Sequence, residues 1–241
     1  MAVISTKAIV ISTIKYGDSS LIARLYTKES GLTSYLIKGV LKSKKGKLKA
    51  AYFQPLTQLK IEANHQDKRD LQSIREAQVT HVYATLHTDV IKQSVVMFLS
   101  EMMSNSIQEQ ESSHLLYDYL EQAFLWLDSH DDLANFHLLF LLNLTRFLGF
   151  YPDTSEMNKN NFHLREGIFT DIIHEKEVIR GEEIVQFKKL LGINFDSIES
   201  IKFSKNQRQD LLRMLIRYFE LHLDGFKKPK SLDVLEAVFS R

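Results

Sequence analysis

The chain has 241 residues, of which 44% are hydrophobic and 25% are charged. This composition is typical of a globular protein with a substantial core, and it excludes disordered, collagen-like and low-complexity classes. The sequence contains no Cys, which excludes disulfides, thiolate zinc sites, iron–sulfur clusters and cysteine nucleophiles. At roughly 100 to 200 residues per domain, the length accommodates one large domain or two smaller ones.

The formal net charge of +1 is a cancellation between unlike segments. Residues 1–80 contain 14 Lys plus Arg and 6 Asp plus Glu, a net charge of +8. Residues 81–160 contain 3 and 11, a net charge of −8, and residues 161–241 contain 14 and 13. From Ser30 to Ile61 there is no acidic residue. This asymmetry favours a basic module for a polyanion beside an acidic module that faces another partner.

Five short strands are predicted in the basic segment, because β-branched and alternating apolar residues recur there with turn residues between them. The predicted strands are Lys7–Ile14, Ser20–Thr27, Leu32–Lys38, Thr57–Ala63 and Leu71–Val79. Lys28-Glu29-Ser30-Gly31 supplies a hairpin turn between the second and the third. Five short strands within about 80 residues are typical of a small closed or partly open barrel.

Beyond His81 the apolar residues follow a helical period instead. Ile91 to Met102 and Leu116 to Leu127 each carry apolar residues along one helix face. Phe136 to Phe150 is apolar nearly all round, which predicts a central buried helix that ends near Gly149 and Pro152.

The rest of the helical region carries a small insert and a further helix. Asp153 to Arg165 is polar and Asn-rich, which predicts a loop or small insert, and a short β-like piece follows at Gly167–Ile173. Ser204 and Gln207 have the spacing of a capping box that opens a helix. The predicted fold is α+β, with a barrel at residues 1–80 and a helical domain at 81–241 that contains the insert at about 151–175.

The most informative segment is the basic loop, Lys38 to Phe53, which lies between two predicted strands and ends in an aromatic pair. Lysine ammoniums follow a phosphate backbone without fixed geometry, and aromatic rings offer faces to unstacked bases. The six lysines of the loop are Lys38, Lys42, Lys44, Lys45, Lys47 and Lys49. The alternatives are a solvated charged loop, or a non-enzymatic interaction scaffold whose basic loop binds an acidic protein partner.

Aromatic residues on the neighbouring strands are candidates for base stacking. Tyr16, Tyr26 and Tyr35 occupy predicted strands or their ends. Packing in the barrel core is the commoner outcome for aromatics at strand spacing, so for each tyrosine the two interpretations compete. Arg24 and Tyr35 join the six lysines as the predicted DNA-binding residues.

Enzymatic motifs are missing from the sequence. There is no Walker-type phosphate loop, no G-x-G-x-x-G after a strand, no H-E-x-x-H and no G-x-S-x-G. Nine His are scattered, and the closest pair, His81 and His87, does not have helical ligand spacing. We therefore expect a protein that is not an enzyme and that has no cofactor and no metal site. A nuclease, the competing class of enzyme, would need clustered carboxylates for Mg²⁺.

The sequence shows no secretory signal and no membrane span. Phe136 to Leu142, the most apolar stretch, falls far short of the roughly 18 apolar residues of a spanning helix. We therefore expect a soluble cytoplasmic protein without a membrane partner.

Four segments, in this order and spacing, resemble the RecO family of bacterial DNA repair and recombination mediators. They are GDSSLIARLYTKESGLTSYLIKGV at Gly17–Val40, FQPL at Phe53–Leu56, FLGFYPD at Phe147–Asp153 and LDGFKKPKS at Leu223–Ser231. Together they cover positions from the first strands to the carboxyl-terminal region.

The resemblance implies an amino-terminal OB-fold barrel followed by a helical domain. It implies binding of single- and double-stranded DNA, annealing of complementary strands, and cooperation with RecR in loading RecA onto DNA coated by single-strand-binding protein. It also implies a place in the bacterial cytoplasm, at the nucleoid during repair. Many relatives carry a four-cysteine zinc module, which Tyr151–Phe169 cannot form because it has no Cys. We expect packing of Phe162, Leu164, Ile168 and Phe169 to hold the insert instead.

The resemblance also suggests a protein partner for the helical domain, namely the acidic, apolar-tipped tail of single-strand-binding protein. Candidate receptor side chains are Arg146, Arg208, Arg213 and Arg217. The alternative for an i, i+4 pair such as Arg213 and Arg217 is a solvated helix face. For the acidic segment 81–160, a scaffold that keeps DNA on the barrel by repulsion and a solvated helix face remain two competing interpretations.

Overall fold

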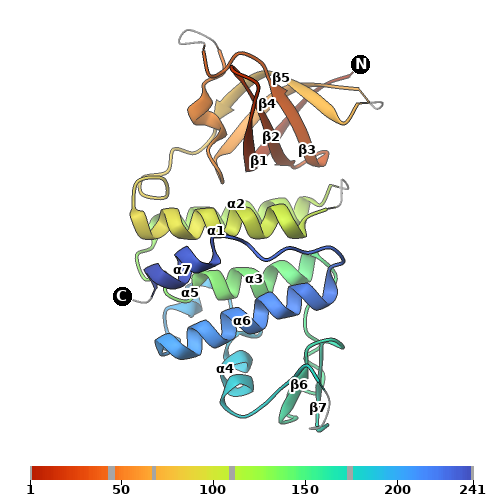
Figure 1. The fold of residues 1–241 in the computed structure, drawn as a ribbon, viewed down its shortest axis with the longest axis vertical. Helices are drawn as coiled ribbons and strands as arrows, with labels where there is room; N and C mark the ends of the chain where they lie inside the picture. The colour runs from red at the N-terminus through yellow and green to blue at the C-terminus, as the bar shows by residue number, and fades with distance from the viewer. Residues whose placement is uncertain (1, 43–46, 67–68, 109–111, 173–175, 240–241) are drawn as a thin grey trace. The chain divides into compact units, whose positions relative to one another are not determined.

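The computed structural model describes residues 2–42, 47–66, 69–108, 112–172 and 176–239 (Figure 1). The chain divides into two compact units, Met1–Asp128 and Ser129–Arg241, and each is described by itself. Among the described residues, the first unit contains a five-stranded barrel, a short 3₁₀ helix and two α-helices, and the second contains five α-helices and a small sheet. The α+β class predicted from the sequence is confirmed.

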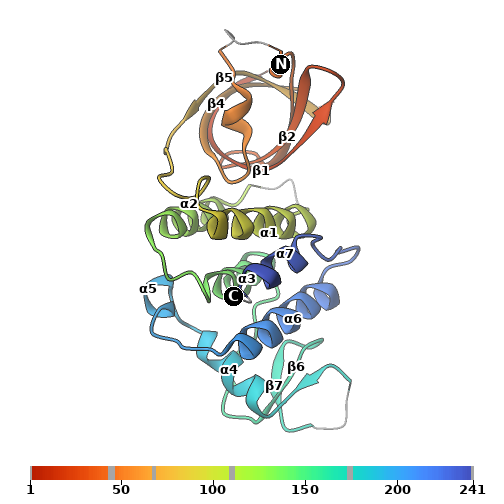
Figure 2. The same cartoon turned by 60° about the vertical axis from the view of Figure 1, so that its left-hand side comes forward.

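A closed five-stranded barrel forms the first half of the first unit, and Figure 2 shows its strands arranged in a ring. The strand order is β1-β2-β3-β5-β4, with one parallel pair between β3 and β5 and antiparallel pairs elsewhere. This is the topology of an OB-fold. The strands are β1 (Ala2–Tyr16), β2 (Ser20–Thr27), β3 (Gly31–Ile37), β4 (Gln58–His65) and β5 (Leu71–Val79). All five predicted strands are confirmed, and β1 extends beyond its predicted bounds at both ends.

Strand β1 pairs with a different neighbour along each of its halves. Residues 2–9 pair with β4, residues 8–16 pair with β2, and the register with β2 shifts between Val10 and Ser12. Such a bulge bends a strand and increases its twist, which lets one long strand take part in two sides of a small barrel. The predicted hairpin after β2 is confirmed, since Thr27 pairs with Gly31, whose φ of 61° is readily adopted by glycine.

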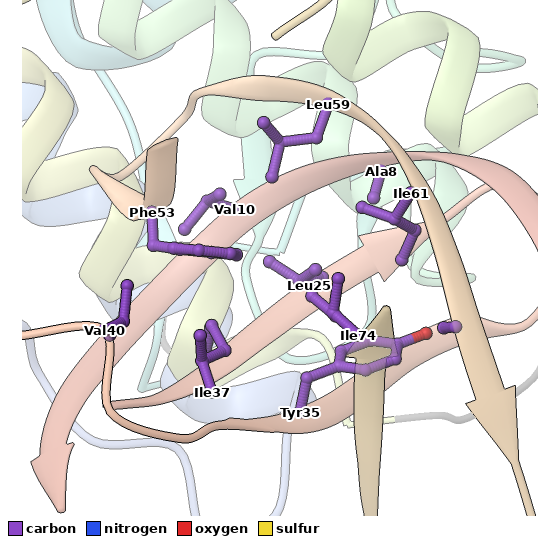
Figure 3. Packing of buried hydrophobic residues seen from close by; sticks show 12 residues of the cluster. Ala8, Val10, Leu25, Tyr35, Ile37, Val40, Phe53, Leu59, Ile61 and Ile74 are labelled. Carbon is purple, nitrogen blue, oxygen red and sulfur yellow. The ribbon is translucent and has the colours of Figure 1, made fainter. Parts of the chain in front are cut away.

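The barrel core consists of the inward-facing side chains of all five strands and of the short 3₁₀ helix η1 (Ala50–Phe53), as Figure 3 shows. Phe53 is buried in this core, so the end of the basic loop is anchored inside the barrel. Burial of each large side chain contributes about 1.5–3 kcal/mol, so the barrel can hold the loop's two ends in place. The buried cluster is Ala8, Val10, Ala23, Leu25, Tyr35, Ile37, Val40, Phe53, Leu59, Ile61, Ala63 and Ile74.

Helices α1 (Val90–Ser106) and α2 (His114–Ser129) belong to the same unit as the barrel. Lys7 Nζ lies 3.0 Å from Glu121 Oε1, and Lys28 Nζ lies 2.6 Å from Asp118 Oδ1. The strands end at Val79, close to the predicted domain boundary at residue 80, but the compact units divide at residue 128. The difference arises because ion pairs and hydrogen bonds attach the first two helices to the barrel.

The second unit is built around α3 (Phe136–Phe147), which contacts α4 (Glu182–Leu190), α5 (Phe195–Ile198) and α6 (Lys205–His222). Helix α7 (Leu232–Val238) follows α6. The prediction of a central buried helix is confirmed, since nine of the twelve residues of α3 are buried. The predicted capping box of α6 is also confirmed, because Ser204 Oγ accepts from the Gln207 amide and Gln207 Oε1 accepts from the Ser204 amide.

The cysteine-free insert is a small sheet of β6 (Asn161–His163), β7 (Ile168–Thr170) and β8 (Val178–Ile179). The Phe162 ring centroid lies 5.0 Å from those of Phe169 and of Phe187 on α4, and Leu164 is buried. The prediction was wrong for Ile168, whose side chain is 42% exposed. Successive side chains of a strand point to opposite faces, so Ile168 faces solvent where Phe169 faces the core.

The carboxylate of Asp128 at the end of α2 fixes the segment between β5 and α1. It accepts backbone hydrogen bonds from Ala84 (2.9 Å), Thr85 (2.8 Å) and Leu86 (2.9 Å). Partial burial favours a raised pKa, but these hydrogen bonds outweigh it and hold the pKa of Asp128 below its usual value. The buried Lys92 ammonium donates to Thr85 Oγ1 and to the Asp128 carbonyl, both at 2.7 Å.

Replacing Asp128 with Asn should lower the free energy of unfolding at pH 7 by about 1–3 kcal/mol, because the amide cannot accept all of these hydrogen bonds. A carboxyl group with a lowered folded-state pKa stabilises the fold above its unfolded-state pKa, and this stabilisation is lost as the pH falls through the folded-state value. The difference between wild type and Asp128→Asn should therefore shrink below pH 3.8, the usual pKa. Denaturant-induced unfolding of both proteins at a series of pH values measures this difference in unfolding free energy.

Asp224→Asn is the matched control, because Asp224 is exposed. Its effect on the unfolding free energy should be small at every pH. Equal stability of Asp128→Asn and wild type at pH 7 would contradict the role assigned to this carboxylate.

Candidate nucleic-acid interface

Four lysines of the barrel and the basic loop differ in whether a carboxylate lies nearby. Lys7 and Lys28 form the ion pairs with α2 described above. Lys38 and Lys42 are exposed, and neither has an ion pair among the residues that the structure describes. The predicted Lys44 and Lys45 lie outside the described residues. The charges of Lys7 and Lys28 are thus paired with carboxylates, whereas those of Lys38 and Lys42 are left available at the start of the basic loop.

Two further predicted lysines lie at the end of the basic loop. Lys47 Nζ lies 2.5 Å from Glu76 Oε1, and this hydrogen bond raises the pKa of Lys47 and lowers the pKa of Glu76. Both side chains are exposed, so solvent weakens the pair. The ammonium of Lys49 lies 5.9 Å from the centroid of the Tyr52 ring. Lys49 therefore keeps its charge available to an anion, whereas Lys47 shares its charge with Glu76.

A groove of about 340 Å³ separates the basic loop from the turn between β4 and β5. Lys38 and Leu48 line it on the loop side, and Gln66 and Arg69 line it on the turn side. Residues of β3, β4 and β5 complete the lining. The groove therefore places cations on both sides of a strand surface, which is the arrangement that a nucleic-acid backbone requires.

Gln72 holds the turn that carries Arg69. Its side-chain oxygen accepts from the Gln66 amide at 2.9 Å, and its nitrogen donates to the carbonyls of Gln66 (3.0 Å) and Arg69 (2.6 Å). The Arg69 side chain is exposed, and the described part of the chain offers it no ion pair. It also lines a second hollow of about 410 Å³ together with Arg24 and His65.

Arg69 is a cation of the groove that the sequence did not predict. It follows Asp67 and precedes Asp70, so its mixed-charge surroundings lack the signal of the acid-free basic loop. The short spacing between the fourth and fifth predicted strands was the available clue, because a hairpin turn between them places its residues at one barrel end.

Arg24 has a structural contact that the sequence did not reveal. Its guanidinium donates to Ser104 Oγ at 3.0 Å and to the Ser104 carbonyl at 3.2 Å, and burial lowers its pKa. Arg24 thus attaches β2 to α1 within the first unit. It still lines the second hollow, so its predicted contact with DNA stays a prediction.

The prediction that Tyr35 stacks on a base is wrong, because its side chain is completely buried (0% exposed). Figure 3 shows its ring inside the barrel close to Leu25 and Ile74. Its hydroxyl lies 2.8 Å from His65 Nε2, and burial raises the pKa of Tyr35. Tyr26 is buried as well, whereas Tyr16 at the end of β1 is 54% exposed. Among the three candidate tyrosines, Tyr16 alone presents an accessible ring.

In the second unit, Arg213 and Arg217 already have carboxylate partners. Arg217 binds Glu177 through Nη2 at 2.5 Å and through Nε at 3.1 Å, and it binds Glu220 at 3.1 Å. Arg213 Nε lies 3.4 Å from Glu236 Oε1. Hydrogen bonding to Arg217 lowers the pKa of Glu177. Both arginines are therefore poorly placed to attract a further acidic segment.

The two arginines line one hollow of about 380 Å³ between α4 and α6, together with Glu182, Glu183 and Asp210. Burial, reinforced by the nearby Asp210, raises the pKa of Glu183. The carboxylates in the lining outnumber the arginines, so this hollow disfavours an acidic ligand.

The other two candidate arginines lie elsewhere in the second unit. Arg208 donates to the Phe203 carbonyl at 2.7 Å and lines a small hollow with residues of α7. Arg146 is exposed, and its guanidinium carbon lies 4.3 Å from the centroid of the Tyr151 ring. The structure thus brings Arg213 and Arg217 together but does not join all four arginines in one site.

The described residues contain neither a cluster suited to a metal ion nor a helix suited to crossing a membrane. No group of three or more His, Asp or Glu side chains there could hold a metal ion. No helix in this part of the chain is long and apolar enough to cross a membrane.

The chain is similar to a family of known proteins over nearly its whole length. Residues 1–83 match the family described as "Recombination protein O N terminal", and residues 87–233 match "Recombination protein O C terminal". A relative from Christiangramia forsetii named "DNA repair protein RecO" is 50% identical over 236 residues, 98% of this chain and 99% of the relative. Relatives of the same name from Flavobacterium johnsoniae and Phocaeicola vulgatus are 48% and 35% identical, each over 98% of this chain and 99% and 98% of their own lengths.

Replacing Arg217 with Gln should raise the pKa of Glu177 towards its usual value of 4.5, because the guanidinium that stabilises the carboxylate is removed. Titration of the glutamate carboxyl carbons by NMR measures the shift. Lys227→Gln is the control and should leave Glu177 unchanged. An unshifted Glu177 in Arg217→Gln would show that Arg217 is available to other ligands in solution.

Proposed function

The chain belongs to the RecO family of DNA repair proteins, and on this premise we propose that it binds DNA through the basic loop and the adjacent groove of the barrel. The observation that carries the proposal is the uneven neutralisation of the barrel. Lys7 and Lys28 are paired with α2, whereas Lys38, Lys42 and Arg69 have no ion pair among the described residues. Contacts of lysine ammoniums with phosphates carry no sequence information, so the binding has little sequence preference.

Strand annealing follows from the same charge distribution. Two DNA strands repel one another through their phosphates, and a basic surface that holds both reduces this repulsion. Annealing of complementary strands therefore requires no catalytic group. The binding of both single- and double-stranded DNA is supported by the basic loop, because ammoniums on long side chains adapt to either backbone.

The partners proposed for the protein are RecR, single-strand-binding protein and, indirectly, RecA. Single-strand-binding protein presents an acidic tail, which requires cations that are not already neutralised. We therefore assign the tail to the helical domain with Arg146 and Arg208 as the candidate contacts, in preference to Arg213 and Arg217 with their carboxylate partners. In this scheme the protein and RecR help to load RecA onto the coated strand.

The competing function is a non-enzymatic scaffold whose basic loop binds an acidic protein partner. Both functions use the same lysines, so they differ in the ligand alone. Binding of single-stranded DNA that weakens steeply with salt separates them, since the scaffold requires no such binding.

A double variant, Lys38→Gln with Lys42→Gln, should weaken binding of single-stranded DNA roughly tenfold near physiological salt. Each phosphate contact that is lost should also reduce the slope of log affinity against log salt by about 0.7. Fluorescence anisotropy of a labelled oligonucleotide at several salt concentrations measures both quantities.

The matched control is Lys7→Gln with Lys28→Gln, which removes the same charge from lysines that are paired with α2. Its salt slope should stay at the wild-type value. Equal losses in the two double variants would mean that net charge, and not the position of the basic loop, determines binding.

The wild-type protein should accelerate pairing of complementary strands coated with single-strand-binding protein, and the Lys38, Lys42 double variant should be slower in proportion to its affinity. A fluorescence-quenching assay with labelled complementary oligonucleotides measures the rate. Normal annealing by a variant that no longer binds single strands would contradict the mechanism based on charge neutralisation.

A further inference from the structure

The groove between the basic loop and the turn from β4 to β5 has an apolar lining that phosphate binding does not use. Leu36 of β3, Leu48 of the loop and Leu71 of β5 line it, and Leu71 is 39% exposed. We propose that this groove holds one unstacked base of single-stranded DNA. The inference rests on the proposed DNA binding. It adds which residues of the groove contact the base and which contact the phosphates.

Aliphatic side chains provide the surface for the face of the base. Bases have apolar faces that pack on side chains without regard to sequence, and each such contact is lost when the side chain is truncated. Leu36 and Leu71 belong to β3 and β5 at the point where these strands pair, with Ser34 opposite Leu71 and Leu36 opposite Ser73. Their position on paired strands fixes the separation of the two leucines.

Two polar side chains complete the lining beside these leucines. Asn64 of β4 and Ser73 of β5 are register partners, so they are neighbours on one face of the sheet. Within the described residues, neither side chain has a hydrogen-bond partner. The amide and the hydroxyl together offer donors and acceptors, which can meet the edge of any base. The groove therefore adds base contacts without imposing a sequence.

The cations on the two sides of the groove match the backbone of such a nucleotide. Lys38 lies on the loop side and Arg69 on the turn side, and Gln72 holds the turn in place. The volume of about 340 Å³ lies at the lower end of the range of small-ligand pockets, roughly 300–1,000 Å³. A single nucleotide with its base on the leucines can thus place its flanking phosphates near both cations.

A duplex cannot use the groove in this way, because its bases are paired and stacked inside the helix. The lysines of the basic loop contact phosphates of either form, whereas the groove contacts a base that has left the stack. The structure thereby separates binding of any DNA from selection of the single strand.

The test compares Leu71→Ala with Leu115→Ala, an equal truncation of an exposed leucine on α2. Three probes are used: an oligonucleotide, a sugar-phosphate oligomer of the same length without bases, and a duplex. Leu71→Ala should weaken binding of the oligonucleotide about tenfold, the order of one base contact, and leave the other two probes unchanged. Leu115→Ala should match wild type on all three.

A second variant, Leu71→Trp, makes the test independent of a loss of affinity. Its larger face should tighten binding of the oligonucleotide, and the new tryptophan should be quenched by the oligonucleotide but not by the abasic oligomer. The base site would be overturned if Leu71→Ala bound the oligonucleotide as wild type does and Leu71→Trp showed no selective quenching. If the wild-type protein still bound DNA in that case, the proposed function would stay intact. A wild-type protein that binds none of the three probes would overturn the proposed function itself.

Discussion

The short parallel pairing between β3 and β5 is the constraint on which the barrel surface depends. These strands have seven and nine residues but pair at three positions, Ser34 with Leu71, Tyr35 with Gln72 and Leu36 with Ser73. This ladder closes the ring, and closure places the Tyr35 ring in the core. Because the pairing is parallel, the basic loop leaves from one end of this ladder and the turn that precedes β5 enters at the other. The groove with Lys38 on one side and Arg69 on the other is a result of this closure.

A second feature, the charge of α2, affects how positive charge is distributed over the barrel. Asp118 and Glu121 of the acidic segment pair with Lys28 and Lys7. Two of the negative charges of residues 81–160 therefore form ion pairs that attach α2 to the barrel. These ion pairs reduce the positive charge that Lys7 and Lys28 present. Exposed ion pairs of this kind stabilise a fold by about 0–1 kcal/mol each, so their larger effect is on the distribution of potential.

The sequence predicted the fold more fully than the site. Strand periodicity and turn residues identified all five barrel strands, and the capping pattern at Ser204 identified the start of α6, because these signals are local. Side-chain contacts between distant residues were not predictable in this way. Tyr35 alternates correctly for a strand, but the direction in which it points depends on closure of the barrel. The carboxylates that occupy Arg213 and Arg217 lie up to 40 residues away in sequence, so spacing alone gave no sign of them.

For the proposed annealing function, a binding surface divided between the groove and the basic loop has a physical advantage. Phosphate contacts hold strands of any sequence, and they exchange with salt ions, so a bound strand can slide into register with its complement. A strand held by phosphates alone can keep its bases stacked along its whole bound length. One base held on Leu36 and Leu71 interrupts the stack at a single position and leaves its neighbours free to pair. Since the proposed contacts are two aliphatic faces and the side chains of Asn64 and Ser73, the base can leave when a complementary strand offers Watson–Crick pairing.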